Sequence, residues 1–238
     1  MSVKAVVRGY MPEDVPPFGA LLSLAVQQVL TMFPATVLVA ILTKMDVGAT
    51  LFTSGIGTII ALLVSRRRIP MYYGSSFSYI AVIMAAMIQF VPDCFNDVTM
   101  TYCPEGVRLV QAGIIGTGVL EILLGLLIVR VGKAALDKVL PASITGPVAL
   151  LIGLSLAGAA INMAAANWAV ALVTLAATIL ASVYLQGKGL LGMLPIVIGA
   201  AVGYAFSVLL GIVDFSVVDN AAWVALPNLT LPVFDGVP

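Results

Sequence analysis

The stretch Pro70-Met71-Tyr72-Tyr73-Gly74-Ser75-Ser76-Phe77-Ser78-Tyr79 is polar and opens a hydrophobic segment that runs to Val91. It comes directly after the basic run Arg66-Arg67-Arg68. Proline disfavours helix at the residue before it, and Gly74-Ser75-Ser76 suits an extended piece that then caps a helix starting near Phe77. The sequence therefore predicts a helix that is broken at this stretch.

A break of this kind inside a membrane indicates a binding site. Irregular backbone and polar side chains are tolerated in a bilayer only where protein or water covers them. A helix N-terminus there presents free N–H groups and the positive end of its dipole to a ligand oxygen. The alternative is a continuous helix whose serine hydroxyls bond to carbonyls four residues back. The clustering of serines and tyrosines at one end favours the broken helix.

The composition indicates a membrane protein. Of the 238 residues, 61% are hydrophobic and 9% are charged, the formal net charge is zero, and there is no histidine. Because soluble domains carry about 25% charged residues, a soluble domain and a disordered chain are excluded and a nucleic-acid partner is disfavoured. Because there is no histidine, metal sites, catalytic triads and proton shuttles built on imidazole are excluded, and no cofactor is expected.

Seven apolar segments are each long enough to cross a bilayer, which takes roughly 20 residues. None has the period-two alternation of a membrane strand. The predicted fold is an all-α polytopic membrane protein whose third span is broken by a short extended segment. The expected spans are Phe18–Leu42, Gly48–Ser65, Met71–Val91, Leu109–Val131, Val139–Ile161, Trp168–Gln186 and Leu190–Val213.

The basic residues alternate between the two sides of these spans, nine on one side and two on the other. This asymmetry predicts a cytoplasmic N-terminus and an outer C-terminus in the cytoplasmic (inner) membrane. The first apolar run is a full span, so no cleaved signal is expected. The nine are Lys4, Arg8, Arg66, Arg67, Arg68, Arg130, Lys133, Lys138 and Lys188, and the two are Lys44 and Arg108.

The odd number of spans has a topological consequence. A homologous unit of seven that followed this one would enter the membrane upside down, and inverted repeats of this kind recur in secondary transporters. No repeat is evident within the chain. We therefore expect the chain to be one repeat of a seven-plus-seven transporter.

Two spans contain polar residues away from the broken stretch. The first carries Gln27-Gln28 and Pro34, which indicate either a ligand contact or a proline kink with an interhelical amide bond. In the fourth, Glu121 is the only ionisable residue deep in a span, and it shares a helical face with Gly118 and Gly125. Small residues predict close packing there, so Glu121 is expected to face protein, as a functional carboxylate or as a protonated acid that joins two helices.

Stripes of small and hydroxyl residues in the last three spans predict tight helix packing and no chemistry of their own. They are Gly146, Gly153, Ala157 and Ala160 in the fifth span, Thr174, Thr178 and Ser182 in the sixth, and Gly199 and Gly203 in the seventh.

The loop after the third span contains both cysteines, Cys94 and Cys103, on the predicted outer side. On an oxidising face they could pair as a disulfide, and two free thiols are the alternative. The acidic residues expected on the same side are Asp46, Asp93, Asp97, Glu105, Asp214, Asp219 and Asp235.

Tyr73-Gly74-Ser75-Ser76-Phe77 resembles the signature that opens the third span of the nucleobase–ascorbate transporter family (nucleobase:cation symporter-2), and of its uracil permeases in particular. Further similarities are colinear over nearly the whole chain. They are Thr31 to Val39, Gly55-Ile56-Gly57-Thr58, Leu156-Ala157-Gly158, Leu194-Pro195-Ile196, Gly199, Gly203-Tyr204, Gly211 to Asp214 and Trp223 to Pro227.

The resemblance implies fourteen spans in two inverted repeats, divided into a core and a gate domain. Residues 1–17 would be a cytoplasmic segment, 18–131 core spans, 132–213 gate spans, and 214–238 an outer tail leading to a second repeat that this sequence lacks. It also implies uptake of a nucleobase, commonly with protons. The substrate-binding residues it implies are Ala35, Gly74, Ser75, Ser76 and Phe77, with the Phe77 N–H meeting the base.

This sequence departs from the family pattern at two places. Gln28 stands where the family usually has histidine, so Gln28 is the candidate replacement contact. The base-binding carboxylates of the family lie in its eighth and tenth spans, and this sequence ends at Pro238, before them. We therefore expect the chain to need a second seven-span half, in cis or in trans, with a homodimer as one form of the latter.

Three functions are compatible with these features. The first is secondary active transport of a nucleobase, most simply uracil, with proton coupling. The second is an anion transporter of the sulfate-permease type, which shares the seven-plus-seven plan. The third is a truncated membrane subunit that does not transport. No enzymatic activity is expected, because no catalytic residues form a plausible set.

Overall fold

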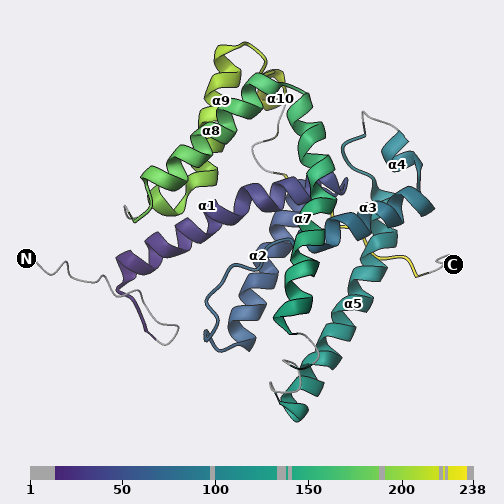
Figure 1. Cartoon of the computed structure of the whole chain (residues 1–238). Helices are drawn as coiled ribbons and strands as arrows, with labels where there is room; N and C mark the ends of the chain where they lie inside the picture. The colour runs from purple at the N-terminus through teal and green to yellow at the C-terminus, as the bar shows by residue number, and fades with distance from the viewer. Residues whose placement is uncertain are drawn as a thin grey trace, which may run out of the picture. The chain divides into compact units, whose positions relative to one another are not determined.

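The structure is a computed structural model that describes residues 14–96, 100–132, 138, 141–187, 191–219, 222 and 225–234. Every regular element in these ranges is a helix, in agreement with the predicted all-α class (Figure 1). The helices are α1 (Phe18–Leu42), α2 (Val47–Val64), α3 (Ser78–Phe90), α4 (Asp93–Asn96), α5 (Pro104–Val131), α7 (Ala142–Ala165), α8 (Trp168–Tyr184), α9 (Pro195–Leu209) and α10 (Ser216–Asp219), with a 3₁₀ turn at Leu191–Met193.

Some predictions concern residues outside these ranges. They are the sidedness of Lys4, Arg8, Asp97, Lys133, Lys188 and Asp235, and the similarity at Trp223 and Val224.

Four of the described helices, α1, α2, α5 and α7, are long and apolar enough to cross a membrane. The helices α3, α8 and α9 are also apolar, but they have 13, 17 and 15 residues. A span takes about 17–25 residues, so α3 and α9 are shorter than a full span and α8 is at the lower limit. The predicted class of polytopic helical membrane protein therefore agrees with the structure.

The break in the third hydrophobic segment is present. Residues 70–76 have no regular secondary structure, and α3 begins at Ser78. The expected capping by a serine side chain is wrong, because the N-cap residue is Phe77 and no side chain bonds to the first turn. Instead the carbonyls of Ser76 and Phe77 accept the N–H groups of Tyr79 and Ile80. Both serines precede the N-cap, so their hydroxyls fall outside the capping position.

The chain divides into two compact units, each of which is described by itself. One consists of residues 1–37, 51–75 and 170–221, and the other of residues 38–50, 76–169 and 222–238. In the second unit α3 packs against α4, α5 and α7. Its core joins Ile83 and Met87 of α3 to Val107 and Val110 of α5. The C-terminal half of α3 is thereby fixed to the start of α5.

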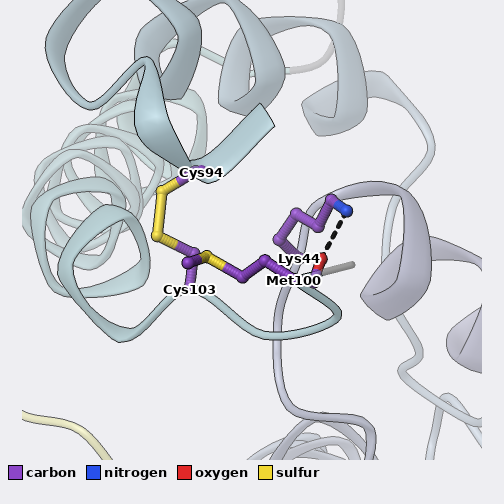
Figure 2. Close-up of a disulfide and its surroundings, with 4 residues drawn as sticks. All are labelled: Lys44, Cys94, Met100 and Cys103. Atoms are coloured by element: carbon purple, nitrogen blue, oxygen red, sulfur yellow. Dashed lines mark hydrogen bonds between the residues drawn. A yellow bond between two sulfur atoms is a disulfide. The ribbon is translucent and has the colours of Figure 1, made fainter. Parts of the chain in front are cut away.

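A disulfide between Cys94 and Cys103 closes the loop that joins α3 to α5 (Figure 2). Their Cα atoms are 5.6 Å apart, and both side chains are buried. Lys44 lies two residues after the end of α1 and has a left-handed backbone conformation. Its Nζ donates to the Met100 carbonyl, and its own carbonyl accepts the Cys103 N–H at 3.0 Å. Of the two alternatives for these cysteines, the structure has the disulfide.

Replacing Cys94 and Cys103 by serine is expected to destabilise the second unit by about 2–4 kcal/mol, because the crosslink restricts the unfolded chain. Thermal unfolding of the detergent-solubilised protein, with and without reductant, measures the effect. Reductant should lower the melting temperature of the wild type and leave the double variant unchanged. An unchanged wild type whose thiols are shown to be reduced would contradict the expectation.

Residues 228–233, which have no regular secondary structure, bond to the first two turns of α5 and to Asp46. The Val233 N–H donates to the Arg108 carbonyl and the Arg108 Nε to the Leu231 carbonyl, each at 3.2 Å. The Gln111 amide donates to Thr230 at 2.9 Å. Asn228 donates to the Asp46 carboxylate at 3.2 Å. Residues that the sequence assigned to outer loops are therefore neighbours in this unit.

In the first unit, α8 and α9 pack through the predicted stripes. A Cβ placed on Gly199 would lie 2.9 Å from the Thr178 Cβ, and one on Gly203 would lie 3.1 Å from the Thr174 Cβ. Both glycines are buried. The prediction of tight packing is confirmed here, and the structure adds that each glycine meets a threonine of the preceding helix.

At four glycines of the other predicted seams, no atom of a neighbouring element in the described part of the chain lies close to the backbone. Nothing lies within 4 Å of a Cβ placed on Gly118 or Gly125 of α5, or on Gly146 or Gly153 of α7. The expected close packing of another helix across Gly118 and Gly125 is therefore wrong here. In the described part of the chain, α3 meets this face of α5 through the long side chain of Tyr79, as described below.

Candidate functional site

The extended segment that precedes α3 is held to α2 by Thr58. The Tyr73 N–H donates to the Thr58 Oγ1 at 3.0 Å, and this hydroxyl donates to the Ser54 carbonyl at 2.8 Å. Residues 70–76 make no helical or strand hydrogen bonds of their own, so a side-chain partner is needed to fix them. Thr58 belongs to the Gly55–Thr58 similarity, which gave no indication of this partner.

Gly74 packs closely against α1. A Cβ at this position would lie 3.2 Å from both Met32 Cε and Thr36 Oγ1, and 2.9 Å from the Tyr72 ring. Thr36 is fully buried and donates to the Met32 carbonyl at 3.0 Å. The predicted residue Ala35 shares this face of α1 by its spacing. Glycine at position 74 therefore allows the extended segment to reach the α1 face that contains Ala35.

The other residues of this unit that were predicted to bind substrate are more exposed to solvent than Thr36. Gln28 lies one turn before Met32 on the same face of α1 and is exposed, whereas Ala35 and Ser75 are half-buried. Ala35, Gln28, Gly74 and Ser75 thus all belong to the first unit.

Ser76 and Phe77 belong to the second unit, where Phe77 lines a pocket. The pocket has a volume of about 160 Å³, and Phe77 is 37% exposed. This volume lies below the roughly 300–1,000 Å³ of pockets for drug-sized ligands, so it suits one small ring. Its walls are Phe77, Ser78 and Ala81 from the start of α3, and Val148, Leu151, Ile152, Ser155 and Leu156 from α7.

Glu121 lies in the middle of α5 and bonds to α3. The Tyr79 hydroxyl donates to Glu121 Oε1 at 3.0 Å and is 3.4 Å from the Thr117 Oγ1. Thr117 in turn donates to the Ile114 carbonyl at 2.8 Å. Glu121 is exposed, and its contact with α3 is made by the tyrosine side chain.

The sequence analysis missed the roles of Thr58 and Tyr79, as well as the α7 wall of the pocket. Tyr79 lies in the stretch that was recognised as unusual, but its partner is 42 positions away. No local pattern signals a pairing over that separation.

Thr58→Val is expected to loosen the extended segment, because it leaves the Tyr73 N–H without its partner. Losing such a bond costs about 1 kcal/mol, so the segment should open about fivefold more often. The measurement is the labelling rate of Ser75→Cys by a water-soluble maleimide. Both native cysteines are in the disulfide and do not react. Thr58→Ser keeps the hydroxyl and is the control, so equal rates in the two variants would contradict the assigned role.

Comparison with known proteins agrees with the predicted resemblance. The Permease family matches residues 19–236. The chain is 36% identical to the uracil permease of Bacillus caldolyticus over 94% of its length, and 36% identical to that of Bacillus subtilis (strain 168) over its whole length. It is 35% identical to the uracil permease of Escherichia coli (strain K12) over 92% of its length.

These alignments cover 50%, 53% and 50% of the three relatives. The chain thus spans about half the length of the curated relatives it matches. Since both the family match and the relatives extend over nearly all of its residues, the chain belongs to the Permease family.

Proposed function

We propose that this chain forms the first seven-span half of a secondary transporter that carries a nucleobase, most simply uracil, across the cytoplasmic membrane with protons. The observation that carries the proposal is the irregular segment 70–76, followed by the start of α3 at Phe77 and Ser78. A half-helix N-terminus that faces a cavity suits the oxygen atoms of a polar ring. The names of the relatives identify uracil as the first substrate to test.

In this proposal α3, α8 and α9 cross the membrane together with their flanking residues, which completes seven spans. Segment 70–76 precedes α3, and the 3₁₀ turn at Leu191–Met193 precedes α9. Contacts of residues 228–233 with Arg108, Gln111 and Asp46 support a common side for the predicted outer loops. The N-terminus then lies in the cytoplasm and the C-terminal tail outside.

The proposed base-binding groups are Phe77 with its backbone N–H, together with Gly74, Ser75, Ser76 and the α1 residues Ala35 and Gln28. Core spans would occupy residues 18–131 and gate spans residues 132–213. The second half supplies partners for the backbone of segment 70–76, because unpaired backbone groups cost several kcal/mol in hydrocarbon. A second copy of this chain is one form of that half.

Uptake of radiolabelled uracil tests the proposal in cells that lack their own uracil permease. The chain is expressed alone and together with the C-terminal half of the Bacillus caldolyticus protein. Accumulation in at least one of these cells, driven by an inward proton gradient and competed by uracil, is expected. Competition by sulfate in place of uracil would overturn the nucleobase assignment, and no accumulation of any base would overturn transport.

A further inference from the structure

The first turn of α3 is held differently from the rest of the helix. The C-terminal half of α3 is fixed by Ile83 and Met87 in the core and by the disulfide loop that follows the helix. At its start, Phe77, Ser78 and Ala81 face α7 across the pocket. The hydrogen bonds of the first turn to α5 come from Tyr79, through its hydroxyl.

Tyr79 therefore connects the pocket to Glu121. It lies two residues after Phe77, and its half-buried ring packs at the edge of the core. Its hydroxyl reaches a carboxyl group 17 residues into a helix of 28 residues. Ile80, in the same turn, is fully buried, and the Tyr79 hydroxyl adds the polar contact of this turn to α5.

The strength of the contact depends on the charge of Glu121. A hydrogen bond to an ionised carboxylate is roughly twice as strong as one to a neutral group. Protonation of Glu121 weakens the bond from Tyr79, and ionisation strengthens it. A firmly held first turn keeps the Phe77 N–H in place before the ligand arrives, which favours binding by pre-organisation.

The described charged groups on the helices that pack around α3 in the second unit lie away from this contact along those helices. Helix α7 has no charged residue, and α3 has none apart from the titratable Tyr79. Asp93 is on α4, at the far end of α3. On α5, Glu105 and Arg108 lie near its start and Arg130 near its end. At 1.5 Å per residue, Arg130 is about 13 Å and Arg108 about 19 Å along the helix from Glu121.

From this geometry we infer that Glu121 and Tyr79 are positioning residues of the binding site, and that the charge of Glu121 sets the affinity of the Phe77 pocket for its base. The inference rests on the proposed function. In this inference Glu121 controls the affinity for the base, and other groups carry the proton that is coupled to transport.

The test measures uracil affinity from acid to alkaline pH in whichever preparation above accumulates uracil. The dissociation constant of Glu121→Gln, divided by that of the wild type, is expected to rise from about one at acid pH to about five at alkaline pH. Tyr79→Phe should weaken binding by a similar factor at alkaline pH, and the double variant should be no weaker than either single one. Glu121→Gln should still accumulate uracil in response to a proton gradient.

Two controls are matched to these changes. Glu105→Gln removes an exposed carboxylate from the same helix, and Tyr184→Phe removes an exposed hydroxyl from α8; both should keep the wild-type pH profile. A constant ratio for Glu121→Gln at every pH, or full affinity in Tyr79→Phe, would overturn the inference while uracil transport stands. Loss of gradient-driven uptake in Glu121→Gln would assign Glu121 to proton coupling and would also overturn the inference.

An infrared measurement in lipid vesicles tests the contact without any substrate. Acidification should produce a protonated carboxyl C=O band that Glu121→Gln abolishes and Tyr79→Phe shifts. If Tyr79→Phe leaves that band in place, the inference fails whether or not uracil is transported. If the band behaves as expected but no preparation binds a base, the proposed function fails and the contact stands.

Discussion

Gly199→Leu is expected to prevent α8 and α9 from packing and to remove most of the folded protein. A Cβ at this position would lie 2.9 Å from the Thr178 Cβ and 3.1 Å from the Thr174 carbonyl oxygen. Neither atom can move without shifting the α8 backbone. Overpacking of this kind costs about 1–3 kcal/mol even for small additions, and leucine adds three further carbon atoms. The gain in helix propensity over glycine is at most about 1 kcal/mol, so the clash dominates.

The expected result for Gly199→Leu is a fall of about tenfold or more in the monodisperse fraction during size-exclusion chromatography in detergent. Gly116→Leu is the matched control, because a Cβ on Gly116 of α5 meets nothing within 4 Å. The milder change Gly199→Ala should lower the melting temperature, and adding Thr178→Gly should restore part of the loss by removing the opposing Cβ. Equal behaviour of Gly199→Leu and Gly116→Leu would refute the assigned helix contact.

In the proposed transporter, Gly74→Val is expected to lower uracil uptake by about tenfold or more, with a smaller loss of stability. The Tyr72 ring and the end of Met32 can turn away from a new side chain, since both are flexible. Thr36 cannot, because it is fully buried and bonded to the Met32 carbonyl. The extended segment must therefore move away from α1, which displaces the residues that lead to Phe77.

Uptake rate and melting temperature together distinguish this displacement from general unfolding. Gly55→Ala in α2 is the control, because a Cβ there meets nothing within 4 Å. In the background of Gly74→Ala, the change Thr36→Ala removes the opposing hydroxyl and should recover part of the uptake. A Gly74→Val protein that transports at the wild-type rate would show that the close approach to α1 has no role in transport.

The sequence by itself determined the elements that depend on local hydropathy and backbone preference. The first span was predicted as Phe18–Leu42, which are the bounds of α1, because a long apolar run needs no partner to define it. The break before α3 was also predicted, since Pro70 and Gly74-Ser75-Ser76 disfavour helix. Serine capping failed because the register of the first turn differs by one residue from the expected one.

Only the tertiary structure decided which residues meet. Thr58 with Tyr73, Tyr79 with Glu121, and Thr178 with Gly199 each join segments 15 or more positions apart. Small-residue stripes look alike in sequence, yet the glycines of the α9 stripe meet the threonines of the α8 stripe, whereas a Cβ on Gly118, Gly125, Gly146 or Gly153 meets nothing within 4 Å in the described part of the chain. The sequence likewise did not decide between a disulfide and two free thiols. The folded chain places the two Cα atoms 5.6 Å apart, where the disulfide forms. Hydropathy fixes where a helix forms, whereas its partners depend on how helices distant in the chain pack together.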